Sequence, residues 1–132
     1  MNAKIISITI ITWIIFMFLA IINAGIRNRV YKPIVGNLTA HQISTLLFTI
    51  IIFVVTYLVF HFNHLEINDS EALIMGSIWL IFTIGFEFVA GHYIFGNSWE
   101  TLFADYNLLK GRIWSFVLIT TFLAPFLTHK LV

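Results

Sequence analysis

The chain has no cysteine, only two prolines and few charged residues, and these shortages exclude several classes of protein. Without cysteine there can be no disulfide, thiolate zinc site, thioether-linked haem or cysteine nucleophile. Charged residues make up 10% of the 132 positions, against about 25% in soluble domains, which is too little polar surface for a water-soluble globule. The net charge of +1 and a pI of about 8.1 do not build the basic face of a nucleic-acid-binding protein.

Hydrophobic residues are abundant instead. They make up 60% of the chain, aromatic residues make up 17%, and the mean hydropathy is +0.97. Disordered chains are poor in aromatic and β-branched residues, so this composition also excludes disorder. The length suits one domain. We therefore expect an integral membrane protein whose residues 1–132 form a single transmembrane domain.

Four apolar runs predict four transmembrane helices packed as an all-α bundle. The runs cover residues 5–22, 43–60, 72–95 and 113–128, and at about 1.5 Å per residue each approaches the ~30 Å of a hydrocarbon core. With their ends, the predicted spans are about 5–24, 41–62, 72–95 and 112–129. The first run is longer than the roughly 7–15 residues of a signal-peptide core, so we expect it to be retained.

Two short motifs predict where helices begin. Thr39 with Gln42, and Asn68 with Glu71, have the spacing of capping boxes at the heads of the second and third spans. Pro33 and Gly36 are helix breakers, so residues 23–38 are expected to form a loop rather than to continue the first helix.

The distribution of Lys and Arg predicts the orientation of the spans. Five of the seven lie in the loops that follow the first and third spans, and only Lys4 and Lys130 lie on the other side. Because cationic loops tend to stay in the cytoplasm, both termini are expected outside the plasma (inner) membrane. Arg27, Arg29 and Lys32 should also attract anionic headgroups at the inner face.

Residues 98–110 predict a short amphipathic helix in the membrane interface, between the third and fourth spans. Its apolar arc contains Trp99, Leu102, Phe103, Tyr106 and Leu109, and its polar side contains Glu100, Thr101, Asp105 and Asn107. Trp99 and Tyr106 are the residue types that anchor such helices at the surface. Two interpretations stay open: the helix is a surface anchor, or its polar face with Asp105 and Asn107 covers a cytoplasmic vestibule.

Glu87 is the one charged residue inside the third run, about eight residues or roughly 12 Å from its inner end. An ionised carboxylate at that depth is costly unless it is paired, protonated or hydrated, so it must face protein or water. Asn23 ends the first span on the same side, Arg27 follows it, and Arg112 heads the fourth span. We expect Asn23, together with either Arg27 or Arg112, to compensate Glu87. Either proton or cation exchange or helix–helix bonding is compatible with such a carboxylate.

The histidines do not form a diagnostic metal or haem motif, and no cofactor is predicted. His41 and His92 belong to the same inner surface, but no further ligands stand at the required spacing. His61 and His64, near Glu66, are weak candidates for a metal site at the outer end of the second span.

The sequence predicts a small membrane protein whose function centres on an inner-leaflet polar cluster. We expect a transport or channel component that handles a proton, a cation or a small polar solute, and four short helices imply a homo-oligomer or a partner membrane subunit. The alternatives are a structural or accessory subunit and, third, a lipid-modifying enzyme; no conventional catalytic motif is present, so a non-enzymatic role is favoured. The predicted cluster contains Asn23, Arg27, His41, Glu87, His92, Asp105, Asn107 and Arg112.

Overall fold

The computed structural model describes residues 2–94, 96–104 and 114–131 of the chain. Within these residues the structure is helical and has no strand. The elements are α1 (Ala3–Ile26), the π-helix η1 (Arg27–Tyr31), α2 (Lys32–Val35), α3 (Asn37–Phe62), α4 (Asp69–Val89), the π-helix η2 (Ala90–Ile94), α5 (Trp99–Ala104) and α6 (Trp114–His129).

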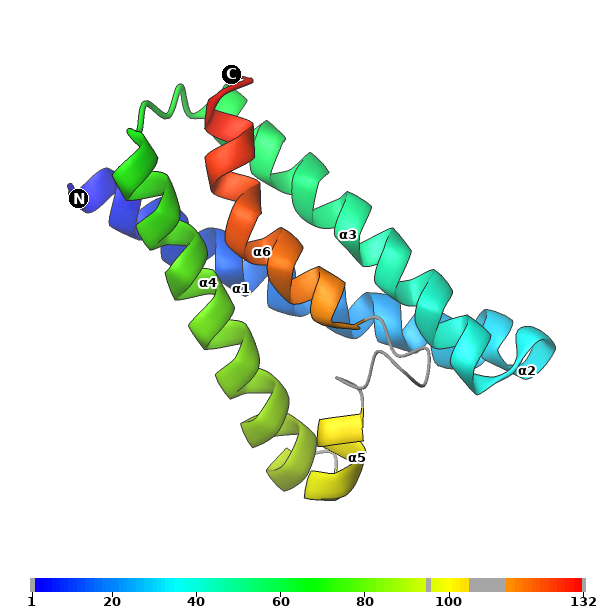
Figure 1. Cartoon of the computed structure of the whole chain (residues 1–132). Helices are drawn as coiled ribbons and strands as arrows, with labels where there is room; N and C mark the ends of the chain where they lie inside the picture. Colours follow the sequence, from blue (N-terminus) through cyan, green and yellow to red (C-terminus); the bar gives the residue numbers. More distant parts are fainter. Residues whose placement is uncertain (1, 95, 105–113, 132) are drawn as a thin grey trace.

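The four longest helices run alternately up and down, so the two ends of the chain lie at the same end of the bundle (Figure 1). Two side-chain contacts join the helices there. Lys4 Nζ, at the start of α1, donates to the carbonyl oxygen of Asn63 after α3 at 2.9 Å. His129 Nε2, at the end of α6, lies 2.8 Å from Asp69 Oδ1 at the start of α4. We call this the terminal end, and the opposite end, with η1 and α2, the basic end.

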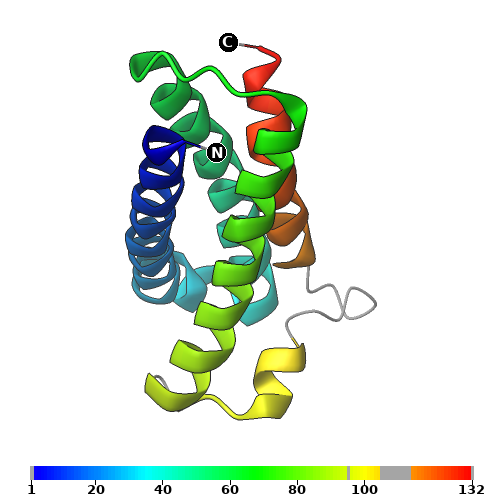
Figure 2. The same ribbon diagram turned by 90° about the vertical axis from the view of Figure 1, so that its left-hand side faces the viewer.

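Helix α6 packs between α3 and α4, and α1 makes fewer contacts with the same two helices. Figure 2 shows α1 and α4 on the near side of the bundle in a view turned by 90°. Because α6 has 16 residues and α3 has 26, α6 does not follow α3 along its whole length (Figure 1). In the described part of the chain, α6 therefore fills the bundle mainly toward the terminal end.

Three helical segments are long and apolar enough to cross a membrane: Ala3–Val35, Asn37–Phe62 and Asp69–Ile94. The apolar helix Ser115–His129 is shorter. The all-helical, membrane-compatible fold that the composition predicts is confirmed, but the count of four spans is not: among the described residues, three helices have the length of a span. At about 1.5 Å per residue, the 16 residues of α6 extend roughly 24 Å, which explains the difference.

The expected loop over residues 23–38 is wrong. The chain stays helical through η1 and α2 and changes direction only at Gly36, where φ is +88°, a conformation that favours glycine. Pro33 does not break the helix because it stands in the first turn of α2, where its missing N–H is not needed for a helical hydrogen bond.

The two predicted capping boxes have different outcomes. The box at Asn68 is confirmed: Glu71 N donates to Asn68 Oδ1 at 2.8 Å, and Asn68 N donates to Glu71 Oε1 at 3.2 Å. The prediction of a box at Thr39 and Gln42 is wrong, because α3 already begins at Asn37, directly after Gly36.

The hydrophobic core lies in the part of the bundle toward the terminal end, where all four long helices meet. Trp79 is fully buried, stacks edge-on against Phe16 with ring centroids 4.9 Å apart, and donates from Nε1 to the carbonyl of Thr9 at 2.9 Å. Helices α4 and α6 approach so closely at Gly76 that a Cβ atom there would lie 2.0 Å from the carbonyl oxygen of Phe122. Glycine is thus required at this contact.

Candidate functional site

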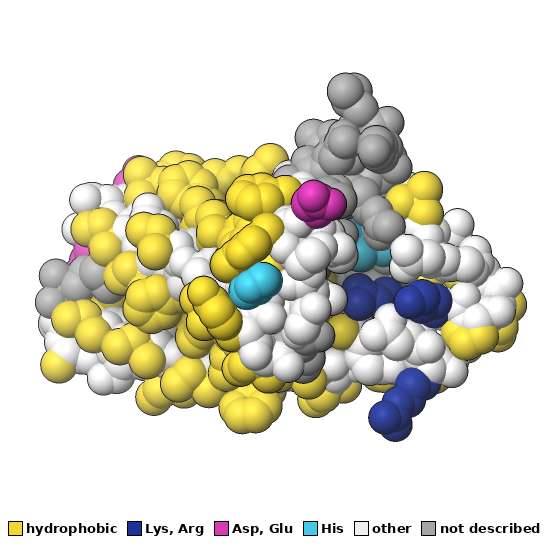
Figure 3. All heavy atoms as spheres, turned by 90° about the horizontal axis from the view of Figure 1, so that it is seen from below, with side chains coloured by type: hydrophobic (Ala, Val, Ile, Leu, Met, Phe, Trp, Pro, Cys, Tyr) yellow, Lys and Arg dark blue, Asp and Glu magenta, His cyan; other side chains and the backbone are white. Residues whose placement is uncertain are grey.

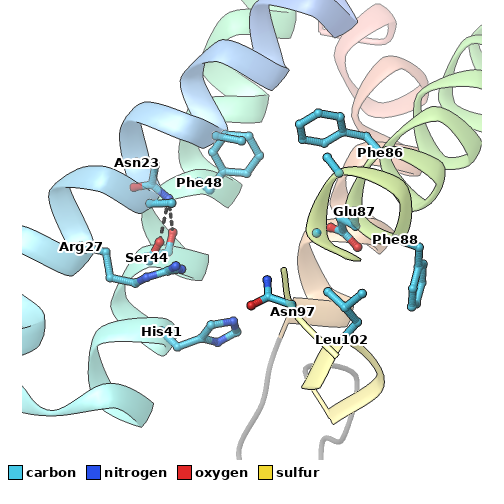
Figure 4. A pocket seen from close by; sticks show the side chains of 14 residues that line it. Asn23, Arg27, His41, Ser44, Phe48, Phe86, Glu87, Phe88, Asn97 and Leu102 are labelled. Atoms are coloured by element: carbon cyan, nitrogen blue, oxygen red, sulfur yellow. Dashed lines mark hydrogen bonds between the residues drawn. The ribbon is translucent and has the colours of Figure 1, made fainter. Parts of the chain in front are cut away.

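A cavity of about 210 Å³ lies between the helices toward the basic end. One wall comes from α1, η1 and α3 and carries Asn23, Arg27, His41 and Ser44. The other comes from α4, η2, α5 and the segment before α5, and it carries Glu87, Gly91, Asn97 and Leu102 (Figure 4). Figure 3 shows the molecule from below, with Lys and Arg side chains gathered on one part of the face in view. The cavity therefore brings opposite charges to two facing walls.

The first wall is held together by Asn23. Its Nδ2 donates to both the hydroxyl and the carbonyl oxygen of Ser44, at 2.8 and 3.0 Å, and so ties the end of α1 to the beginning of α3. Both N–H groups of this amide therefore serve Ser44. The expectation that Asn23 donates to Glu87 is not what the geometry shows, because Glu87 stands on the opposite wall (Figure 4).

The second wall is oriented by the face of α4 that carries Thr83 and Glu87. Trp13 Nε1 on α1 donates to Thr83 Oγ1 at 3.2 Å, so this face is turned toward α1. Glu87 is four residues further on, hence on the same face about one turn closer to the basic end. Its side chain is half-buried and lines the cavity rather than the lipid-facing surface.

Helix α5 completes the second wall. Leu102 is buried against Gly91, where an added Cβ would lie 2.7 Å from Leu102 Cδ2. Asn97 and Leu102 line the cavity, while Trp99 and Phe103 pack near Phe88 with ring centroids 6.3 and 5.1 Å away. Helix α5 thus borders the cavity through Leu102, whereas Asp105 and Asn107, on which the covering interpretation depends, lie outside the described residues, so that interpretation stays a prediction.

Both helices that flank the cavity change to π-helical geometry beside it. Helix α1 passes into η1 at Arg27, and α4 passes into η2 at Ala90. Arg27, Ala90 and Gly91 all line the cavity. Since π-helical turns are rare and are frequent at functional sites, this pair of irregularities marks the same place as the polar side chains.

The structure brings together four members of the predicted cluster, Asn23, Arg27, His41 and Glu87. Three others, Asp105, Asn107 and Arg112, lie outside the described residues, as does the predicted surface anchor Tyr106. Arg29 and Lys32 lie at the same basic end and are exposed.

His92 does not line the cavity. Its ring stacks on that of Trp99 with centroids 3.9 Å apart and 14° between the planes, and its Nδ1 donates to the carbonyl oxygen of Asn97 at 2.8 Å. These contacts fix the turn between η2 and α5. The position of His92 is therefore a structural one in this arrangement.

The weak metal candidates lie at the terminal end. The ring of His61 stacks on that of Tyr57 with centroids 5.9 Å apart, and His64 follows in the turn after α3 with φ of +49°. Among residues 2–94, 96–104 and 114–131, no three His, Asp or Glu side chains form a group that could hold a metal ion.

Two cavity residues were not singled out from the sequence. A serine within an apolar run usually bonds back to its own helix, as Ser77 does to Leu73 at 2.8 Å, so nothing marked Ser44 as the partner of Asn23. Asn97 is the second; the side chain that accepts a backbone N–H at the head of α5 is that of Ser98, whose Oγ accepts from Thr101 N at 3.1 Å. Asn97 is thereby left to line the cavity.

Comparison with known proteins gives no match for this chain, whether to a family model, to a curated protein or to a solved structure.

Proposed function

We propose that the chain is a four-span integral membrane protein that acts as a transport or channel component, handling a proton, a cation or a small polar solute in the cavity beside Glu87. The observation that carries this proposal is the position of that carboxylate. It comes from an apolar helix, yet it is directed into a cavity whose facing wall holds Arg27 and His41. A carboxylate is tolerated within a span when it faces protein or a wet cavity.

The size of the cavity supports this role. At about 30 Å³ per molecule, a volume of about 210 Å³ has room for several water molecules or one small solute. Toward the terminal end the bundle is filled by Phe16, Trp79 and their neighbours. The cavity therefore extends through only part of the bundle, so transport across the membrane requires a rearrangement, a second copy or a partner subunit.

The proposed topology follows from the charges at the two ends. Arg27, Arg29 and Lys32 lie at the basic end, which we assign to the cytoplasmic face of the plasma (inner) membrane, with α6 as a short fourth span. The terminal end, and with it both chain termini, then faces outward.

The test compares Glu87→Gln with Glu100→Gln. Glu100 is an exposed carboxylate on α5 that does not line the cavity, so it is a matched control for the loss of one negative charge. In proteoliposomes with an entrapped pH indicator, the proposal expects Glu87→Gln to abolish a proton-linked flux that Glu100→Gln leaves intact. Both variants should keep the particle size of the parent in detergent. Equal fluxes in all three proteins would overturn the role of Glu87.

A second candidate, an accessory subunit, is favoured by the bonds of Asn23. That amide is committed to Ser44 and acts as a tie between α1 and α3, which shows that one cluster member holds helices together. If Glu87→Gln disassembles the protein and the parent itself supports no flux, the accessory role replaces the transport role. No comparable observation favours a lipid-modifying enzyme, since His92 is stacked on Trp99 outside the cavity.

A further inference from the structure

A larger groove of about 720 Å³ continues from the cavity toward the middle of the bundle. Its volume lies within the roughly 300–1,000 Å³ typical of ligand pockets. Its apolar floor is formed by Trp13, Phe16, Met17, Ala20, Phe48 and Ile52, and its polar rim by Arg27, Asn28, Lys32, Asn37, His41 and Glu87. The polarity of this groove thus changes along its length.

The change occurs at the same level on separate helices. On α1, Trp13, Met17, Ala20 and Ala24 form a continuous stripe along the groove, and Arg27 follows one turn later. On α3, which runs the opposite way, Ile52 and Phe48 lie at the apolar end and His41 lies at the rim. A polarity gradient built from two antiparallel helices is a property of the folded bundle, because neither sequence segment alone defines it.

The length of the groove matches a membrane amphiphile. The 14 helical steps from Trp13 to Arg27 correspond to about 21 Å along the helix axis. One leaflet contributes roughly half of a ~30 Å hydrocarbon core. The groove is therefore long enough for one hydrocarbon chain, with its headgroup at the level of Arg27.

We propose that this groove binds an anionic amphiphile from the bilayer, with its phosphate or carboxylate headgroup at Arg27 and Lys32 and its hydrocarbon chain along the stripe from Trp13 to Ala24. A purely polar solute would leave the apolar floor unused, and a purely apolar ligand would gain nothing from the two cations at the rim. The ligand that satisfies both parts carries an anion at one end and a chain at the other. This inference stands independently of flux through the Glu87 cavity.

The groove differs from the ordinary lipid-exposed surface of α1. The outer side of that helix carries large, exposed isoleucines such as Ile10, Ile11 and Ile22, whereas the groove side carries the small residues Ala20 and Ala24. Arg29 offers an internal comparison, because it belongs to the same basic end and is exposed but does not line the groove.

The experiment uses fluorescence of the full chain in nanodiscs of phosphatidylcholine. The probe is a single-chain alkyl phosphate brominated in mid-chain, which quenches only tryptophans in contact with it. Trp13 lines the groove, whereas Trp79 is fully buried in the core. Trp99 is exposed but does not line the groove, so probe dissolved in the bilayer quenches it without saturation. The proposal expects the saturable component of the quenching to be lost in Trp13→Phe.

Charge variants identify the headgroup site. Replacing Arg27 and Lys32 together by Gln should weaken half-saturation about tenfold or more, since each cation near the surface contributes on the order of 1 kcal/mol to anion binding. Arg29→Gln, the matched control, should bind as the parent does. Lys32→Gln alone, at an exposed position, should weaken binding by a smaller factor and keeps the test valid if the double variant does not fold.

Three outcomes would overturn the proposal. A brominated alkyl glucoside that binds as tightly as the phosphate would show that the chain alone is recognised. Competition by inorganic phosphate at the same concentration would show a site for a free anion rather than for an amphiphile. Equal weakening by Arg29→Gln would show bulk attraction to the basic end, without a defined headgroup site.

Discussion

The two halves of the bundle hold different kinds of polar side chains. In the half toward the terminal end, the hydroxyls of Thr9, Thr56 and Thr121 are buried, and each donates to the carbonyl four residues earlier in its own helix at 2.7 Å. In the half toward the basic end, Asn23 reaches across to another helix, and Glu87 faces a cavity. The hydroxyls are satisfied within their own helix, as that of Thr45 is in the basic half too, whereas the amide and the carboxylate depend on what lies across from them.

The difference follows from hydrogen-bonding capacity. A threonine hydroxyl needs one acceptor, which the preceding helical turn supplies. An amide, a guanidinium or a carboxylate has more groups to satisfy than its own helix offers, so it requires a partner helix or water. A bundle can therefore be closely packed around threonines, but it must stay open around asparagine, arginine and glutamate.

Packing follows the same division. In the terminal half, Trp79, Phe60 and Met75 are fully buried, and the backbone of α4 at Gly76 lies against the backbone of α6 at Phe122. Toward the basic end, the described part of α6 does not extend as far as α3 does (Figure 1), and a cavity and a groove are lined by the other helices. Stability should therefore reside in the terminal half and ligand handling in the basic half.

The largest loss of stability is expected from Gly76→Ala, which disrupts the closely packed half toward the terminal end. The new Cβ would lie 2.0 Å from the carbonyl oxygen of Phe122, so α4 and α6 must separate, at a cost of about 3 kcal/mol. The matched control is Gly85→Ala on the same helix, where a Cβ meets nothing within 4 Å. Thermal unfolding in detergent should show a lowered midpoint for Gly76→Ala alone, and similar midpoints for both variants would contradict the close approach.

Much of the fold could be predicted from the sequence because hydrophobic length and cap chemistry are local properties. Helix α4 has its N-cap at Asn68 and the capping-box partner at Glu71, as expected, and the apolar runs are helical. The helical path over Arg27–Val35 was missed, because a proline in the first turn of a helix and a proline in a loop look alike without the neighbouring backbone conformation.

The candidate site was predictable in residue type but not in pairing. Glu87, Arg27, Asn23 and His41 were expected near one another because they share a membrane level, and they line one cavity. Which of them bond together depends on helix rotation and separation, which single-chain periodicity does not give. The bond from Asn23 to Ser44 was missed for this reason.

Trp79→Phe should produce the next largest loss of stability. The variant removes the bond from the indole to the carbonyl of Thr9 and leaves a small cavity in the core, which together should cost about 2 kcal/mol. Trp13→Phe is the matched comparison, from the boundary of the half toward the basic end. There the indole is half-buried and donates a hydrogen bond to Thr83 Oγ1 at 3.2 Å. Denaturant titration of both variants should give the smaller change for Trp13→Phe; the reverse order would place the stable core elsewhere.

Asn23→Ala tests whether the half of the bundle toward the basic end contributes to stability at all. Losing two bonds to Ser44 should cost about 1 kcal/mol or less, because interhelical hydrogen bonds in membranes are individually weak. Ser44→Ala removes only the bond to the hydroxyl and should have a smaller effect. In a double-mutant cycle the two changes should be less than additive, whereas strict additivity would show that the side chains do not interact.

The smallest effect is expected at the surface of the terminal end, where Asp69→Asn removes the contacts with His129 at 2.8 Å and Lys130 at 3.4 Å. Because Asp69 is 60% exposed, water and salt screen these contacts, and the loss of stability should be smaller than for any of the variants above. Glu66→Gln, in the adjoining turn, controls for the loss of one exposed negative charge. The difference between the two variants should fade as salt is raised. If Asp69→Asn instead destabilised the chain as much as Gly76→Ala does, the half toward the terminal end would depend on ionic contacts at its surface rather than on the packing of α4 against α6.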